Sequence, residues 1–595
     1  MRFAKIALIP LFAALGFALG TGVAAGQTPS TASQSAASQS LAKLFDDVWE
    51  FDLQENPQFA TNVGDARFND RLSRETPADY ERRVERRREF LRRLESIPRA
   101  ELTVAERLNY DIFGRQLRDD IAEFEFGAHL QPITNRSGFH ISFPELPRES
   151  PLQSVRDYEN YLARLRAFPQ YVDDHLALMR AGLKRELVLP AVVLEGYRDS
   201  IVTHIVEDPT KSLFHTPFVK WPESIPQAER ERLALAGRAA ISGSIVPAYR
   251  RFLEFMEQEY VPAARGSIGA SALPQGRDFY RHRVRLFTTT DMTPEQVHET
   301  GLAEVKRIRG EMEAIIKKVG FQGSFADFLT HLRTDPKFYA TTPEQLQKEV
   351  AFILKRIDGE LPRLFRTLPR TPYGLRTIPD YIAPRTTSAY YQPPSGDGRL
   401  GGFYYLNTYN LKSRPLYEME ALSLHEAVPG HHLQLALQQE LTGLPKFRRF
   451  TNFTAFIEGW ALYSERLGLE VGFYEDPYSD FGRLTFEMWR ACRLVVDTGM
   501  HYLGWTREQA IAFMSENTAL AEHNIRAEVD RYISWPGQAL GYKVGELKIR
   551  ELRALAEREL GDKFDVREFH DVVLRDGSIP LSALEQKVRD WAKGK

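Results

Sequence analysis

Cysteine is almost absent from this sequence. The 595 residues include a single one, Cys492, so no disulfide can form within the chain. It lies in an apolar run of helical character over residues 486–494, a setting in which a free cysteine usually behaves as a small buried hydrophobe. We therefore predict a structural thiol and exclude a cysteine nucleophile.

An excess of charge of either sign is also missing. Lysine and arginine total 78 against 80 aspartate and glutamate residues, which leaves a formal net charge of -2. No global field then steers the protein to nucleic acid or to an anionic membrane. The one strongly basic run, residues 82–93, has helical spacing and glutamates within ion-pair reach, which favours a solvated helix face over a nucleic-acid patch. We expect no nucleic-acid partner.

Long apolar runs are missing beyond the N-terminus. Residues 1–26 combine a basic start, a short apolar core and a small-residue exit, which predicts a secretory signal peptide; an uncleaved anchor is the alternative, although the run is short for a bilayer span. No cysteine lies there, which excludes a lipoprotein anchor. The Ser/Thr/Ala/Gln tract over residues 27–40 predicts a flexible linker. We expect an exported protein, periplasmic or secreted, with no membrane span in the mature chain.

Helical periodicity dominates the rest of the chain. Apolar residues recur at three-to-four spacing, and capping signatures begin at Thr76, Thr293, Thr342 and Thr506. The chain is longer than the size at which a single hydrophobic core stops growing. The sequence therefore predicts a mostly α fold over residues 41–595, with two lobes around a central cleft.

One short stretch favours a strand. Residues 402–407, Gly-Phe-Tyr-Tyr-Leu-Asn, form an aromatic run that follows a series of loop-forming residues. This small β element offers either an edge to which an extended substrate adds by backbone hydrogen bonds or a plain structural hairpin. Tyr404 and Tyr405 are its candidate substrate contacts.

The segment His425-Glu-Ala-Val-Pro-Gly-His-His432 places three imidazoles and a carboxylate within eight positions. A zinc hydrolase needs neutral imidazoles and a carboxylate as ligands, an open position for water, and a base beside that water. On an unbroken helix neither later histidine could share an ion with the first. We therefore predict that Pro429 and Gly430 break or bulge the helix. We favour His431 as the second ligand and keep His432 as the alternative.

A helix farther along supplies a second carboxylate. Residues 453–467 have an apolar side in which Glu458 stands, and a buried glutamate is costly unless it is paired or bound to metal. We predict Glu458 as the third ligand, with Glu465 as its fallback or as a partner of a ligand. Glu426 is the general base of this set.

The C-terminal segments are rich in groups that bind or polarise carbonyls. Tyr542 and Tyr532 are candidates to donate to a developing oxyanion, and Arg531 and Lys543 are candidate anchors for a carboxylate. The full set of candidate substrate contacts is Tyr404, Tyr405, His501, His523, Arg531 and Lys543.

These motifs, with Glu458-Gly-Trp-Ala, Gly499-Met-His and Pro536-Gly-Gln-Ala, resemble a large bacterial family that is defined by a conserved domain of unknown function and regarded as candidate zinc metallopeptidases. The resemblance covers essentially all of the mature chain. More distantly, the arrangement is similar to gluzincin peptidases with mostly helical, two-lobed folds, such as the thimet oligopeptidase, angiotensin-converting enzyme and thermostable carboxypeptidase groups. It implies His425, a second histidine and Glu458 as ligands, Glu426 as base, and Tyr532 or Tyr542 as oxyanion donor.

The sequence thus predicts an exported zinc-dependent hydrolase that holds one Zn2+ ion per chain and cleaves amide bonds of short peptides. Two alternatives stay open. One is an amidase or esterase that acts on a non-peptide metabolite, and the other is an exported binding protein without turnover.

Overall fold

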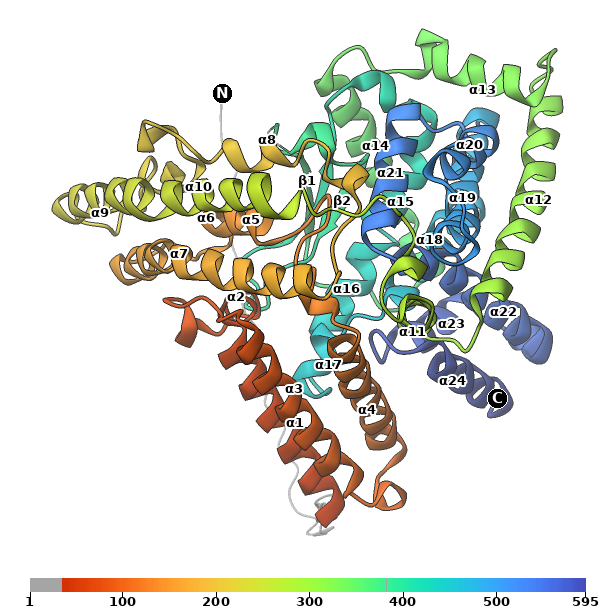
Figure 1. Ribbon diagram of the computed structural model, residues 1–595. Coiled ribbons are helices and arrows are strands. Elements are labelled where there is room, and N and C mark those ends of the chain that lie inside the picture. Colours follow the sequence, from red (N-terminus) through yellow and green to blue (C-terminus); the bar gives the residue numbers. More distant parts are fainter. Residues whose placement is uncertain (1–34, 381) are drawn as a thin grey trace, which may run out of the picture.

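The computed structural model describes residues 35–380 and 382–595, and helices make up most of it (Figure 1). The predicted mostly α fold is confirmed, and so is the small β element before the metal-site segment. The division into two lobes around a cleft stays a prediction.

The first part of the chain contributes four helices, three of which share a small core. The four are α1 (Ala36–Glu55), α2 (Pro57–Asn62), α3 (Pro77–Glu95) and α4 (Val104–Glu125). Leu41, Leu44, Phe90, Leu94 and Phe113 pack together between α1, α3 and α4, which lie side by side at the bottom of Figure 1. The basic run lies on α3, where its arginines form ion pairs, for example with Glu55 and Asp47 of α1.

A second group of helices extends to the left in Figure 1. It consists of α5 (Phe139–Ser142), α6 (Leu146–Glu149), α7 (Val155–Lys184), α8 (Tyr197–Val202), α9 (Gln227–Ala240) and α10 (Val246–Phe255). The helices α11 (Gly276–Thr288), α12 (Pro294–Lys318), α13 (Phe325–Thr334) and α14 (Pro343–Leu364) follow. One continuous hydrophobic core joins them to the C-terminal helices.

The sheet has three strands, β1 (Tyr373–Thr377), β2 (Ala389–Gln392) and β3 (Gly402–Leu406), in the order β1-β3-β2. The predicted strand is therefore β3, but it cannot serve as an edge, because β1 pairs with it in parallel on one side and β2 pairs with it antiparallel on the other. The outer strand on the side of the metal-site segment is β2. The open alternative of an edge at Gly402–Leu406 is thus wrong, and β2 takes that place.

The last part of the chain contributes α15 (Met419–Glu426), α16 (His431–Glu440), α17 (Lys446–Phe450), α18 (Thr454–Leu467), α19 (Pro477–Thr498), α20 (Arg507–Asn517), α21 (Glu522–Ser534), α22 (Gly541–Leu560), α23 (Val566–Leu574) and α24 (Leu581–Lys593). Of these, α15, α18, α20, α21 and α22 pack against α19, as does the earlier helix α12. Every residue of α19 from Phe481 to Thr498 is buried. Cys492 lies in this stretch with no exposed surface, as a structural thiol should. Burial also raises its pKa, which disfavours the nucleophilic thiolate.

Capping residues in the sequence predict where four helices begin. Thr76, Thr293, Thr342 and Thr506 each accept a hydrogen bond from the backbone N–H three residues later, which satisfies one of the free donors of a first turn. All four predicted caps are confirmed.

The N-terminal boundary needs a correction. The predicted signal peptide, residues 1–26, and most of the predicted linker lie outside the described residues. The predicted linker extends to residue 40, whereas α1 already begins at Ala36. Ser35 caps this helix by accepting a hydrogen bond from the N–H of Ser38, and Ala37 and Leu41 are buried on one face. The fold therefore starts about one helical turn earlier than predicted. Within residues 35–380 and 382–595, no helix has both the length and the apolar character that crossing a bilayer requires.

Candidate metal centre

The helix that carries His425 breaks directly after Glu426. The helix α15 ends there, Ala427 leaves the helical region with φ −103° and ψ −107°, and α16 begins only at His431. The intervening Val428-Pro429 bond is cis. A Cβ atom on Gly430 would lie 1.9 Å from the carbonyl oxygen of His425, so this close turn requires glycine. The predicted break at Pro429 and Gly430 is confirmed.

The break brings two imidazoles to one carboxylate. The Nε2 atom of His425 lies 3.6 Å from Oε2 of Glu458, and the Nε2 atom of His431 lies 3.3 Å from the same oxygen. One ligand atom from each of the three side chains falls within 4.8 Å of the others. Two ligands at the usual distances from a tetrahedral zinc ion are separated by about 3.4 Å. The spacing and the donor types therefore fit a zinc ion held by His425, His431 and Glu458.

The hydrogen bonding of Glu458 fits the same assignment. Its Oε2 atom is buried and has no hydrogen-bond partner within residues 35–380 and 382–595. A buried carboxylate oxygen without a partner is costly unless a cation supplies the missing interaction. The two nearby imidazoles hold the pKa of Glu458 well below its usual range, although burial opposes this effect. The carboxylate is thus kept in the ionised form that a metal ligand needs.

A second carboxylate orients His425 from behind. Its Nδ1 atom donates to Oε1 of Glu465 over 2.8 Å, and Arg490 lies 3.3 Å from the same oxygen. This contact directs Nε2 toward Glu458, which is the arrangement expected around a metal-binding histidine. Burial lowers the pKa of His425, but the carboxylates of Glu458 and Glu465 outweigh burial and raise it to about 9. Of the two roles predicted for Glu465, the structure supports that of partner to a ligand.

His432 points away from this cluster. Its Nδ1 atom accepts a hydrogen bond from the Tyr391 hydroxyl over 2.8 Å, and its Nε2 atom donates to the carbonyl oxygen of Thr371 over 3.0 Å. Both ring nitrogens therefore already have protein partners, in a pattern that suits one neutral tautomer. The alternative of His432 as the second ligand is wrong, because its ring faces the sheet.

Glu426 lies where a general base would act. Its side chain lines a cavity of about 260 Å³ together with His425, His431 and Glu458. In the described part of the chain its carboxylate has no hydrogen bond or ion pair, and burial raises its pKa. A carboxylate whose pKa is raised toward neutral pH and which faces open space is suited to take and return a proton.

The two candidate tyrosines differ sharply. Tyr542 lines the metal-site cavity, and its ring lies parallel to that of His425 with 6.4 Å between the centroids. Tyr532 is 1% exposed, and its hydroxyl donates to Glu528 and accepts from Trp489 and Arg493. All of the hydrogen-bonding capacity of Tyr532 is thus used within the protein. The prediction of Tyr532 as an oxyanion donor is wrong, whereas Tyr542 occupies a suitable position.

Two glycines hold the helices of Glu458 and Tyr542 against each other. A Cβ atom on Gly459 of α18 would lie 2.5 Å from the Cα atom of Gly545 of α22, and one on Gly545 would lie 1.9 Å from the carbonyl oxygen of Ala455. The two backbones therefore touch, as they can only where side chains are absent. Glu458 and Tyr542 therefore lie on two helices that are in direct backbone contact.

Most of the predicted substrate contacts lie elsewhere. Lys543 is 0% exposed and ion-paired with Glu304, Glu487 and Glu546, so it cannot anchor a carboxylate. His501 is also 0% exposed, and it bonds the backbone N–H of Ala270 and the carbonyl of Tyr532. These two predictions are wrong because the side chains are committed to the core.

Of the four remaining predicted contacts, three also lie outside the metal-site cavity. Tyr404 is buried and Tyr405 stacks on Tyr390 of β2, and neither lines the metal-site cavity. His523 lies on the surface, 3.3 Å from the carbonyl oxygen of Pro384. Arg531 does line the cavity. Of the six predicted substrate contacts, the structure brings only Arg531 to the metal site.

Sequence reasoning missed four charged residues that line this cavity, namely Arg136, Arg490, Arg493 and Glu528. Arg490 and Arg493 gave a usable signal, since they interrupt the apolar run of α19 at a spacing of three and a buried arginine is unusual. The chain around Arg136 carries no comparable pattern, because only tertiary packing brings it to the site.

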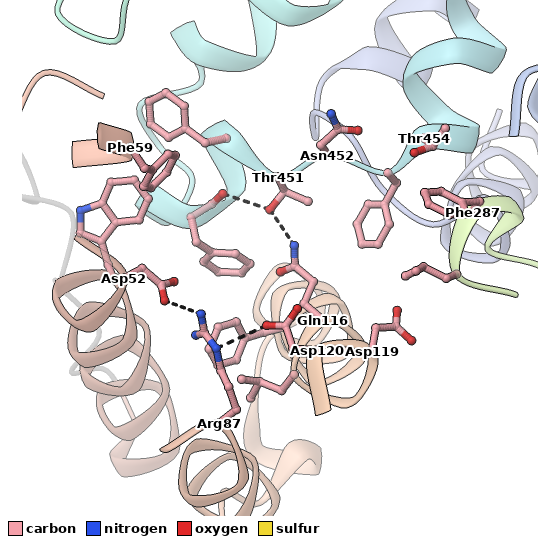
Figure 2. A pocket seen from close by; sticks show the side chains of 17 residues that line it. Asp52, Phe59, Arg87, Gln116, Asp119, Asp120, Phe287, Thr451, Asn452 and Thr454 are labelled. Atoms are coloured by element: carbon pink, nitrogen blue, oxygen red, sulfur yellow. Dashed lines mark hydrogen bonds and ion pairs between the residues drawn. The ribbon is translucent and has the colours of Figure 1, made fainter. Parts of the chain in front are cut away.

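A second, larger cavity of about 340 Å³ lies between the N-terminal helices and α17 (Figure 2). Arg87 reaches Asp52 and Asp120 across it, and Gln116 donates to Thr451. None of the described residues that line it is a histidine, and it shares no lining residue with the metal-site cavity. It therefore offers no comparable ligand set.

Comparison with known proteins supports a family assignment. The family model described as "Bacterial protein of unknown function (DUF885)" matches residues 57–588. The chain belongs to this family. Among solved structures, the chain is similar to a candidate lipoprotein from Colwellia psychrerythraea, which is 30% identical, with a TM-score of 0.90 over 94% of this chain and 100% of that one.

A second solved structure is more distant. It is a candidate lipoprotein of unknown function from Shewanella oneidensis, 18% identical, with a TM-score of 0.68 over 93% of this chain and 99% of that one. At this identity the likeness shows the fold alone. Among curated proteins, none matches this DUF885 chain.

Proposed function

We propose that this protein is an exported zinc-dependent hydrolase that cleaves amide bonds in short peptides. The observation that carries the proposal is the convergence of His425, His431 and Glu458, with Glu426 facing the same cavity. Two imidazoles, one carboxylate and an adjacent base form the donor set of a catalytic rather than a structural zinc site. The predicted signal peptide supports export, and so does the description of the structure that is 30% identical as a candidate lipoprotein.

The side chains divide the chemistry among them. A bound zinc ion supplies a positive charge beside the scissile carbonyl and lowers the pKa of the attacking water. Glu426 takes the proton from that water and passes it to the leaving amine. The Tyr542 hydroxyl donates to the oxyanion as it develops, and Glu465 holds the His425 ring in place.

The position of the outer strand β2 is consistent with an extended substrate. Residues 387–391, which lead into and form most of β2, line the metal-site cavity. A peptide that lies along this strand can form backbone hydrogen bonds while its scissile bond faces Glu426. The cavity volume of about 260 Å³ suits a few residues rather than a folded protein.

The test is a metal analysis combined with a digest. The purified protein should contain one zinc ion per chain and should release products from a library of short peptides. Loss of turnover on chelation, with recovery on return of zinc, is the expected result. Hydrolysis of acylated amines or esters but not of peptides would favour the metabolite amidase or esterase. Absence of both metal and turnover would favour a binding protein.

A further inference from the structure

Three arginines surround a single glutamate beside the metal site. Oε1 of Glu528 lies 3.0 Å from Arg136, and its Oε2 lies 3.0 Å from Arg493 and 3.3 Å from Arg531. Glu528 and Arg493 are 2% and 4% exposed at their side chains. One buried carboxylate cannot neutralise three guanidinium groups, so an excess of positive charge remains in the cavity wall.

Two guanidinium nitrogens in this cavity wall have no hydrogen-bond partner among the described residues. Nη1 of Arg493 and Nη2 of Arg136 are buried and lack a hydrogen-bond partner among the described residues, although both side chains line the cavity. A buried, charged donor without a partner is strongly unfavourable unless a ligand completes it. Arginine donors in this arrangement match the paired oxygens of a carboxylate.

A bound metal would add to this positive charge. Arg136, Arg490, Arg493 and Arg531 line the cavity, against Glu426, Glu458 and Glu528, and Arg490 is also paired with Glu465. A divalent cation at His425, His431 and Glu458 would add two further positive charges. An anionic group on the substrate is the complement that this cavity lacks.

The position of Arg493 limits how far a bound carboxylate can lie from the scissile bond. Its guanidinium carbon lies 4.2 Å from the centre of the Tyr542 ring, which lies 6.4 Å from the centre of the His425 ring. These two distances limit the separation between Arg493 and His425 to about 11 Å. An extended chain covers about 3.3–3.6 Å per residue, and the contact between guanidinium and carboxylate takes up part of the span. The carboxylate therefore lies one or two residues beyond the scissile bond.

We infer that Arg136 and Arg493 bind the terminal carboxylate of the substrate, so that the hydrolase removes one or two residues from the C-terminal end of short peptides. This inference rests on the proposed function and specifies its substrate class. Arg531 donates to Gln538 over 2.6 Å and pairs with Glu528, so its role is to add positive charge beside Arg136 and Arg493.

The first experiment compares substrates on the zinc-loaded protein. A short peptide with a free C-terminus is compared with its C-terminal amide, and with an amidated peptide that carries a glutamate side chain near its end. We expect kcat/KM to fall by 10- to 100-fold for both amidated peptides. Equal cleavage of the free and amidated termini would overturn the inference, and restoration by the glutamate side chain alone would overturn the assignment to the terminal carboxylate.

The second experiment assigns the effect to the arginines. Arg136→Gln should raise KM for the free-carboxylate peptide by about 10-fold or more, with little change in kcat and no further loss for the amide. Arg136 is 21% exposed at its side chain, so this variant should fold, and Arg493→Lys, which retains the charge, serves as a second variant. The control is Arg526→Gln, an exposed arginine of α21 whose one ion pair among the described residues is with Glu522. An unchanged preference in both site variants would contradict the assignment.

A binding measurement separates this inference from the proposed function. Calorimetry with N-acetyl-alanyl-alanine and its C-terminal amide is done on Glu426→Gln, with zinc and after chelation. Tighter binding of the free acid in both states, which is lost in the double variant with Arg136→Gln, would support carboxylate recognition even if no hydrolysis is found. Equal binding of acid and amide would overturn the inference even if the enzyme cleaves peptides.

Discussion

The Nδ1 atom of His425 lies 2.8 Å from Oε1 of Glu465, on the opposite edge of the ring from the Nε2 atom that faces Glu458. A carboxylate in this position fixes the tautomer of a metal-binding histidine and raises its basicity. Glu465→Gln should therefore weaken zinc binding by about 10- to 100-fold while the protein stays folded. Competition with a chromogenic chelator measures the affinity, and Glu551→Gln on the exposed side of α22 is the matched control.

The two adjacent histidines should respond differently to the same change. His431→Gln removes an Nε2 donor from the cluster and should abolish stoichiometric zinc, whereas His432→Gln leaves the cluster intact. Since His432 bonds Tyr391 and Thr371, its variant should lose about 1–2 kcal/mol of stability instead. Metal content and thermal unfolding, measured on both variants, check the pair. Zinc loss in the His432 variant alone would reverse the ligand assignment.

Glu426→Gln should separate metal binding from turnover. The amide cannot take a proton from water, so kcat should fall by about 10²- to 10⁴-fold. Zinc content should remain at one ion per chain, because Glu426 lies outside the cluster of His425, His431 and Glu458. Substantial activity in a zinc-loaded variant would exclude Glu426 as the base.

The two tyrosines provide a matched comparison. Tyr542→Phe removes the candidate donor to the oxyanion and should lower kcat by about 10²- to 10³-fold, with little effect on thermal stability. Tyr532→Phe removes a hydroxyl that bonds Glu528, Trp489 and Arg493, and it should cost about 1–3 kcal/mol of stability. If Tyr542→Phe retained full activity, a different group would have to supply the oxyanion donor.

A buried acid that does not line the metal-site cavity predicts a pH dependence of stability. Burial raises the pKa of Asp497 to about 7, against the opposing effect of hydrogen bonds from Tyr280 and Gly537. The unfolded chain releases this proton near pH 4, so the folded state binds more protons between about pH 4 and 7, and stability falls as pH rises through that window. Asp497→Asn should be more stable than the wild type by about 1–3 kcal/mol at pH 8, and the gain should shrink toward pH 4. Thermal unfolding across this range, with the Tm difference plotted against pH, measures the effect.

The meeting of His425 and His431 with Glu458 could be predicted because the break between the two histidines is encoded locally. Pro429 and Gly430 determine the break, and the break decides which histidine meets Glu458, so adjacent residues carried most of the information. The capping threonines were legible for the same reason. The linker was misplaced because the short apolar face that includes Ala37 and Leu41 falls within a stretch of small polar residues.

Other features depend on contacts that the sequence does not reveal. The strand at Gly402–Leu406 was found, but its central place depends on β1, whose residues lie about 30 positions earlier. Tyr542 and Lys543 are adjacent in sequence, yet successive residues of a helix point about 100° apart, so one faces the metal-site cavity and the other is buried among carboxylates. The packing of α19, α21 and α22 determines that Tyr542 faces the cavity and Lys543 faces the core.

The contact between Gly459 and Gly545 has a consequence for how a substrate enters. Because the two backbones are in contact there, we expect the helices that carry Glu458 and Tyr542 to move together, so that these two side chains keep their relative position. For the proposed hydrolase, we expect a peptide to enter and its fragments to leave at the part of the cavity wall that β2 and the segment of Arg136 line. We expect that part of the wall to move when a substrate binds, while the two helices in contact at Gly459 and Gly545 stay in place.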